Sequence, residues 1–265
     1  MKTTVRSARK AWQLGFVAAL IALTVEPARA IDSESLRLLL LGAQDMNTPQ
    51  TVMRADIAIA LETYKGPRAT EAVAFFSPGK DARWYLQLKD PKLAALVRGA
   101  ERKVMQRTDG TIKTTGFGEP IADLGISYED LSRFVIDDYK LWQIADENND
   151  VVLAGGHPQV ESAYVYRAYT FDKARAIWLK VQFYAKTLNN LVKLRTDSDH
   201  VLIGKKWFPG TIEVQNFLDN SKVTLTIHWS QAAAAPPEIF EPESFPASSP
   251  VPWASPGAPA AKATP

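Results

Sequence analysis

The chain has 265 residues and no cysteine. It can therefore form no disulfide, use no thiolate as a nucleophile, and carry no acylated N-terminal cysteine of the kind that anchors a lipoprotein. Histidine is also scarce. His157, His200 and His228 are far apart in the sequence, and no two of them have the spacing of metal ligands. We therefore expect neither a metal site nor a cofactor.

Long apolar runs are also missing. The run Leu14–Val25 is well short of the ~20 residues that a spanning helix needs, and no other stretch is a better candidate. Basic residues precede this run, and Ala28-Arg29-Ala30 follows it as a small-x-small cleavage site. This pattern is typical of a secretory signal peptide. We predict a signal over residues 1–30, cleavage after Ala30, and a mature periplasmic protein that is not integral to a membrane.

A strong charge of one sign is absent too. Without residues 1–30 the chain holds 26 basic and 28 acidic residues, a net charge of −2. No basic surface of the kind that binds nucleic acid is therefore expected.

Catalytic motifs are equally scarce. The segment Gly125–Glu129 lacks the final glycine of a nucleophile elbow. Ser127, with Asp130 three residues later, instead resembles a capping box and predicts a short helix that runs to about Phe134. Glu129 and Asp130 are interpreted as acidic residues favoured at a helix N-terminus rather than as an acid–base pair. We expect no catalytic residues and predict that the protein is not an enzyme.

What the sequence does have is period-two alternation, which indicates strands with one buried face. In Lys222–Trp229, apolar Val223, Leu225 and Ile227 alternate with polar residues. The predicted strands are Val52–Tyr64, Ala69–Ser77, Arg83–Lys89, Leu93–Arg98, Lys103–Arg107, Leu141–Ala145, Val151–Ala154, Tyr164–Thr170, Ile177–Tyr184, Leu188–Thr196, Lys206–Phe217 and Lys222–Trp229. The expected class is mainly β (α+β).

The remaining segments are predicted as helix, loops or tail. A helix is expected from Ser33 to about Ala43, a mobile loop over Thr108–Pro120, and a turn at Gly155–Pro158. One domain is expected over residues 31–245, within which Pro237–Phe245 can dock through its apolar side chains. Residues 246–265 are almost all Ala, Pro and Ser, which predicts a disordered tail.

Several segments together resemble a known family. They are Gly125–Leu131, Phe183-Tyr184, Leu191-Val192-Lys193, Lys206-Trp207-Phe208-Pro209, Ile212 and Thr224–Ile227. Over Val52–Trp229 the chain resembles the bacterial outer membrane lipoprotein-sorting proteins of the LolA-like superfamily. It departs from the usual pattern at Gly99-Ala100-Glu101, where a proline-bearing turn is common, and in its long Pro/Ala tail.

The resemblance implies an unclosed antiparallel β-barrel of about ten strands around an apolar cavity, with short helices as a lid. It also implies a periplasmic carrier of lipoprotein acyl chains or lipids towards the outer membrane, alongside an inner-membrane exporter of the ABC or RND type. The glycine-containing loop Thr108–Leu124 is expected to be either a movable lid over the mouth of the cavity or an ordinary surface loop.

If the alternation is read along each strand, ten residues face the concave side and are candidates for the cavity lining. They are Ile57, Ile59, Leu86, Leu179, Val181, Phe183, Ile212, Val214, Leu225 and Ile227. The small residues Ala55, Ala72 and Ala74 leave room for a ligand. The alternative is an adaptor module of an envelope exporter that fills its concave face with its own side chains and carries no lipid.

Overall fold

The computed structural model describes residues 33–46, 48–79, 83–148, 151–231 and 237–245. The predicted signal peptide and the predicted tail lie outside the described residues. No helix in the described ranges has the length and hydropathy needed to cross a bilayer.

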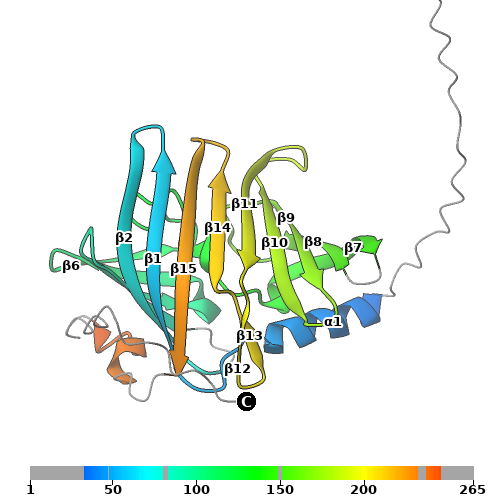
Figure 1. Ribbon diagram of the computed structural model, residues 1–265, viewed down its shortest axis with the longest axis horizontal. Coiled ribbons are helices and arrows are strands. Elements are labelled where there is room, and N and C mark those ends of the chain that lie inside the picture. Colours follow the sequence, from blue (N-terminus) through cyan, green and yellow to red (C-terminus); the bar gives the residue numbers. More distant parts are fainter. Residues whose placement is uncertain (1–32, 47, 80–82, 149–150, 232–236, 246–265) are drawn as a thin grey trace, which may run out of the picture.

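Antiparallel strands dominate the described residues (Figure 1). They are β1 (Met53–Thr63), β2 (Gly66–Phe76), β3 (Arg83–Leu88), β4 (Leu93–Arg98), β5 (Lys103–Thr108), β6 (Thr111–Gly116), β7 (Tyr139–Asn148), β8 (Val151–Pro158), β9 (Tyr166–Asp172), β10 (Ile177–Tyr184), β11 (Leu191–Ser198), β12 (Val201–Ile203), β13 (Lys206–Phe208), β14 (Thr211–Asn216) and β15 (Ser221–Gln231).

Thirteen of these strands form one sheet, in the order β6-β5-β4-β3-β2-β1-β15-β14-β11-β10-β9-β8-β7, and β12 and β13 pair separately. The outermost strands, β6 and β7, are not paired with each other, so the sheet is unclosed. The first strand lies in the middle because β1 pairs with both β2 and β15. Ile57 is opposite Ile227 and Ile59 is opposite Leu225, so the apolar residues of both strands share one face.

Most of the predicted strands are confirmed, with the bounds of Ile177–Tyr184 and Leu93–Arg98 unchanged. The strand predicted over Lys206–Phe217 is instead two strands, β13 and β14, and only β14 belongs to the large sheet. The number of about ten strands that the resemblance implies is too low. The loop expected at Thr108–Pro120 contains the edge strand β6, whose threonines suit a strand. The turn expected at Gly155–Pro158 is the end of β8. A Cβ on Gly156 would come within 3.1–3.3 Å of Leu141, Tyr169 and Tyr139 side chains, so glycine serves close packing here.

The helices are few and short. They are α1 (Ser33–Met46), α2 (Tyr128–Leu131) and the 3-10 turns η1 (Gly99–Glu101), η2 (Ile136–Asp138) and η3 (Pro237–Phe240). The predicted capping box is confirmed: the Ser127 hydroxyl accepts from the Asp130 amide at 3.3 Å, and the Asp130 carboxylate accepts from the Ser127 amide at 2.7 Å. The helix ends at Leu131, short of the expected Phe134.

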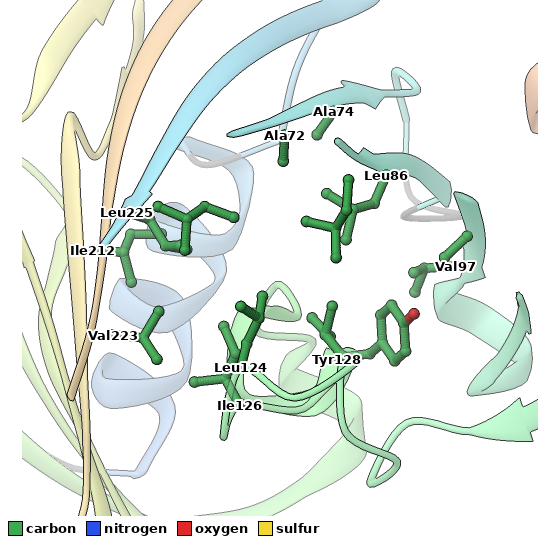
Figure 2. Packing of buried hydrophobic residues seen from close by; sticks show 14 of the residues in the cluster. Ala72, Ala74, Leu86, Val97, Leu124, Ile126, Tyr128, Ile212, Val223 and Leu225 are labelled. Atoms are coloured by element: carbon green, nitrogen blue, oxygen red, sulfur yellow. The ribbon is translucent and has the colours of Figure 1, made fainter. Parts of the chain in front are cut away.

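The face of the sheet that bears Ile59 and Leu225 is called the inner face below, and two separate covers pack on it. One cover is the segment Phe117–Tyr128, whose Leu124, Ile126 and Tyr128 face β1–β4, β14 and β15 (Figure 2). The other is α1, which packs against the β7–β10 side of the sheet through Leu36, Leu40 and Ala43. The inner face is therefore covered at both ends rather than along its whole width.

The opposite, outer face is covered in one region. Ile239, Phe240 and Phe245 pack on outward-facing residues of β2–β4, including Phe75 and Tyr85. The Phe245 ring lies 6.3 Å from that of Tyr85, and its backbone carbonyl accepts from Arg107 at 3.0 Å. The docking expected for Pro237–Phe245 is thus confirmed for its apolar side chains.

Candidate functional site

A cavity of about 130 Å³ lies in the gap between the two covers of the inner face. Its wall is mostly apolar and draws on strands from both halves of the sheet. The side chains that line it on the β1 side are Ala55, Ile57, Ala74, Phe76, Trp84, Leu86, Phe208, Pro209, Ile212, Leu225, Ile227 and Trp229, and those on the β10 side are Arg167, Tyr169, Trp178, Val181, Phe183, Arg195 and Asp197.

The ten candidates predicted from alternation separate into three groups. Seven line the cavity: Ile57, Leu86, Val181, Phe183, Ile212, Leu225 and Ile227. Ile59 and Val214 are also buried on the inner face, but they belong to the cluster covered by Leu124 and Ile126. Leu179 is not part of the lining.

Leu179 is displaced by a β-bulge. The register of β10 against β9 shifts between Trp178 and Lys180, so the strict alternation of the sequence is broken at this point. Trp178, which alternation places on the wet face, is buried on the inner face instead. Its ring centroid is 5.3 Å from that of Tyr169 and 5.5 Å from that of Phe171. A bulge of this kind leaves no clear mark in the sequence.

One short segment also borders the cavity. Residues 131–134, called the crossing segment, begin at the last residue of α2, and all four line the cavity. At one end the Phe134 ring lies 4.9 Å from Tyr169 and 4.8 Å from Trp178. At the other end, Arg133 lies 5.6 Å from the centre of the Phe76 ring and donates to the Ser77 carbonyl at 3.4 Å. The crossing segment thus connects the β2 side of the cavity with the β9–β10 side.

The β11 side of the cavity is charged. The inward positions of β11 are Lys193, Arg195 and Asp197, opposite Phe183 and Val181 of β10 and Val214 and Ile212 of β14. Arg195 holds both carboxylate oxygens of Asp197 at 2.7 Å. Charged inward positions in an otherwise apolar sheet need partners, and α2 supplies them.

Glu129 of α2 is fully buried and accepts four hydrogen bonds. Its carboxylate takes Arg102 Nη2 at 2.9 Å, the Ser162 hydroxyl at 2.6 Å and the Ala163 amide at 2.9 Å, and it also pairs with Arg167. Arg102 reaches this site from the residue after η1, where the backbone adopts the left-handed conformation with φ 52°. Glu129 therefore ties α2 to η1 and to β9.

Asp130, also fully buried, ties α2 to β11. Its carboxylate accepts from Lys193 Nζ at 2.6 Å and pairs with the Tyr164 hydroxyl, and its backbone carbonyl accepts from Arg195 at 3.0 Å. Burial, followed by the nearby charge of Asp130, raises the pKa of Tyr164 well above its ordinary value.

The interpretation of Glu129 and Asp130 as simple helix-terminus residues is therefore incomplete. They are the centre of a buried ionic network whose cations, Arg102, Arg167 and Lys193, come from three other parts of the chain. Their oxygens are occupied by fixed donors, as is typical of a structural network. Among the described residues, no group of three or more His, Cys, Asp and Glu side chains could hold a metal ion.

Solved structures with this architecture include proteins from three bacteria. An outer membrane lipoprotein-sorting protein domain, so named, from Vibrio parahaemolyticus aligns with a TM-score of 0.69 at 17% identity, over 79% of this chain and 97% of that one. A DUF1329 family protein from Desulfovibrio piger aligns with a TM-score of 0.68 at 15% identity, over 80% and 98%. A LolA superfamily protein from Nitrosomonas europaea aligns with a TM-score of 0.63 at 14% identity, over 78% and 97%.

These likenesses show that the chain has the fold of the LolA superfamily and confirm the resemblance seen in the sequence. At such identities they establish the fold alone. A family model described as "-like: Uncharacterized protein" matches residues 108–246, slightly over half of the chain, so the chain belongs to that family. No curated protein matches the chain.

Proposed function

We propose that this protein is a periplasmic carrier that binds acyl chains of lipoproteins or lipids in the cavity of its inner face and transfers them towards the outer membrane. The observation that carries this proposal is the apolar cavity left between two covers that pack independently on the sheet. The fold supports it, because the structures with this fold include a domain named for lipoprotein sorting.

The energetics of an acyl chain explain why a carrier needs no catalytic groups. A chain of about sixteen carbons costs about 12 kcal/mol to expose to water, at ~0.8 kcal/mol per CH₂. Unaided transfer across an aqueous compartment is then negligible. An apolar groove that covers the chain removes most of this cost, so the carrier acts by binding and release alone.

The size of the cavity indicates how binding must occur. Dry cavities of roughly 150 Å³ hold a molecule the size of benzene, and the cavity here is about 130 Å³. A whole acyl chain therefore fits only if a cover moves. We expect the crossing segment to be the cover that moves. Its contact with the β2 side is mainly through Arg133, which makes one long hydrogen bond and one ring contact there.

This assignment moves the lid from the position expected in the sequence. In Thr108–Leu124, residues Thr111–Gly116 are paired as β6, and Ile121 and Leu124 are buried in the core. Opening that segment would break strand pairing and expose core residues. We propose instead that residues 132–134 swing away from Phe76 and Ser77 while α2 stays anchored by Glu129 and Asp130.

The test compares a lysine substitution in the cavity wall with one at the β10 bulge, outside the cavity lining. Ile57 is half-buried and lines the cavity, so Ile57→Lys places a charge beside the acyl chain while its long side chain can still reach water. We expect the variant to fold and to lose binding of a fluorescent fatty acid. The matched control, Leu179→Lys at the bulge, should bind as the wild type does.

Mass spectrometry of lipids that co-purify with the exported protein identifies the cargo. If the wild type binds no acyl probe and carries no lipid, the carrier proposal is wrong. The alternative is then an adaptor of an envelope exporter. The observation that favours it is that α1 and the segment Phe117–Tyr128 already cover much of the inner face.

A further inference from the structure

Arg133 differs from the other arginines in the cavity wall. Arg167 is paired with Glu129, and Arg195 is paired with Asp197. Arg133 has no carboxylate partner among the described residues. Its Nη1 atom is buried without any acceptor, and its Nη2 atom makes one contact at the long limit of a hydrogen bond.

Arg133 is half-buried, and a guanidinium whose Nη1 atom is buried without an acceptor is an unfavourable arrangement that calls for an explanation. Burial lowers the pKa of Arg133 to about 10, so the group still carries its charge at neutral pH. The ring of Phe76 at 5.6 Å compensates only part of this charge. No acidic side chain among the described residues balances the remaining charge.

We propose that Arg133 binds the anionic group of the ligand, and that the ligand is therefore an amphiphile with a carboxylate or a phosphate next to its acyl chain. This inference rests on the proposed carrier function and narrows it. The guanidinium matches both anions, because each can accept two parallel N–H bonds from it. The apolar wall beside Arg133, with Ile57, Leu86 and Ile227, suits the acyl chain.

Because Arg133 lies on the crossing segment, recognition of the ligand is coupled to closure of the cavity. Ligand binding requires this segment to move, and movement breaks the weak contact with the Ser77 carbonyl. An anion on the ligand then replaces that contact with a charge-assisted one. The anionic amphiphile therefore holds the crossing segment in its bound position, whereas a neutral lipid offers Arg133 no acceptor of comparable strength.

The experiment measures the binding of three probes with the same acyl chain: palmitic acid, palmitoyl lysophosphatidic acid and neutral monopalmitoylglycerol. We expect the wild type to bind at least one anionic probe tenfold or more tightly than the neutral one. Charged hydrogen bonds of about 1.5–3 kcal/mol correspond to roughly 10–150-fold in affinity. The tighter of the two anionic probes distinguishes a carboxylate ligand from a phosphate ligand.

The variants test whether Arg133 is responsible for this selectivity. Arg133→Met keeps the length of the side chain and removes the charge, so it should bind the anionic and neutral probes alike. Arg133→Lys should restore part of the preference. Arg68→Met is the matched control, because Arg68 is exposed, pairs with Asp123 and is not part of the cavity wall; its selectivity should equal that of the wild type.

Each possible result decides between the two proposals. Equal wild-type affinity for all three probes overturns the anion inference and leaves the carrier function standing, and this measurement needs no variant to fold. An anion preference that survives in Arg133→Met also overturns the role of Arg133. Failure of every probe to bind overturns the carrier function itself.

Discussion

The two halves of the inner face follow different rules. On β1–β4, β14 and β15, most inward positions are apolar, and the cover formed by Leu124, Ile126 and Tyr128 is mainly apolar as well. On β11 the corresponding positions are Lys193, Arg195 and Asp197, and the cover is the acidic α2. Inward-facing positions of the sheet thus carry apolar or charged side chains according to the segment that covers them.

The two kinds of packing differ in how readily they can change shape. Apolar packing has no directional preference and tolerates repacking, so the first half can adapt its shape to a ligand. Buried ion pairs contribute little net stability compared with apolar packing, but they accept only one geometry. Glu129 and Asp130 therefore fix the start of the crossing segment, while the cavity beside it stays adaptable.

The largest predicted effect comes from breaking the charged half. Glu129→Gln leaves Arg102 and Arg167 without their shared anion, and breaking a buried pair in this way costs about 3–5 kcal/mol. Urea unfolding of the purified protein measures this loss. The matched control is Glu71→Gln in the exposed pair with Lys89, which should cost about 0–1 kcal/mol. Similar losses in both variants would show that burial does not distinguish the two pairs.

A second effect of the charged half is sensitivity to alkali. Burial raises the pKa of Tyr164 and Tyr169 above the ordinary value of about 10. Above pH ~10 the unfolded chain releases phenolic protons that the folded chain keeps. Stability is therefore complete below that pH and falls by about 1.4 kcal/mol per pH unit for each such tyrosine above it.

Tyr164→Phe should remove the contribution of one tyrosine to this fall of stability with pH. The variant also loses the hydrogen bond to Asp130, so it should be less stable than the wild type near neutral pH. Urea unfolding at several pH values between about 9 and 11 gives the slope for both proteins. An unchanged slope would mean that Tyr164 ionises at a similar pH in the folded and unfolded states.

The apolar half should show a smaller effect that depends on the cavity. Ala55 lines the cavity, so Ala55→Leu has space and should change stability by less than about 1 kcal/mol while it weakens fatty acid binding. Ala95 is equally buried but lies in the closed core, where Ala95→Leu should cost about 1–3 kcal/mol. Equal costs at the two positions would argue against usable space beside Ala55.

The smallest effect is expected at the C-terminus. Removal of residues 246–265 should change the free energy of unfolding by less than about 0.5 kcal/mol, because their composition offers little apolar burial. By contrast, Phe245→Ala should cost about 3–5 kcal/mol, because this ring is fully buried on the outer face. Thermal unfolding of the two proteins tests where the folded part ends, and a large loss on truncation would place further packing beyond Phe245.

The alternation of apolar residues was sufficient to predict most strands and seven residues of the cavity wall, because burial on one face determines those positions directly. It missed β6, where turn-like Gly and Thr residues surround a short polar edge strand. It also misplaced Leu179 and Trp178, because a bulge depends on the neighbouring strand.

The charged network was hidden for a different reason. Arg102, Glu129, Arg167 and Lys193 are scattered along the sequence, and each alone is an ordinary charged residue. Only the tertiary fold brings them together. Ser127 and Asp130 could be predicted because a capping box is a local pattern, whereas the partners of Asp130 in β11 are not.

The central position of β1 also determines the order in which the protein can assemble. Met53 pairs with Gln231, so β1 emerges early and waits for β15, the last of the described strands to be made. At ~5–20 residues per second, synthesis leaves one edge of β1 unpaired for on the order of 10–40 seconds. Long-range pairing of this kind folds slowly, and an open apolar edge invites association with other chains. A holding chaperone would therefore matter most during the interval before β15 is complete.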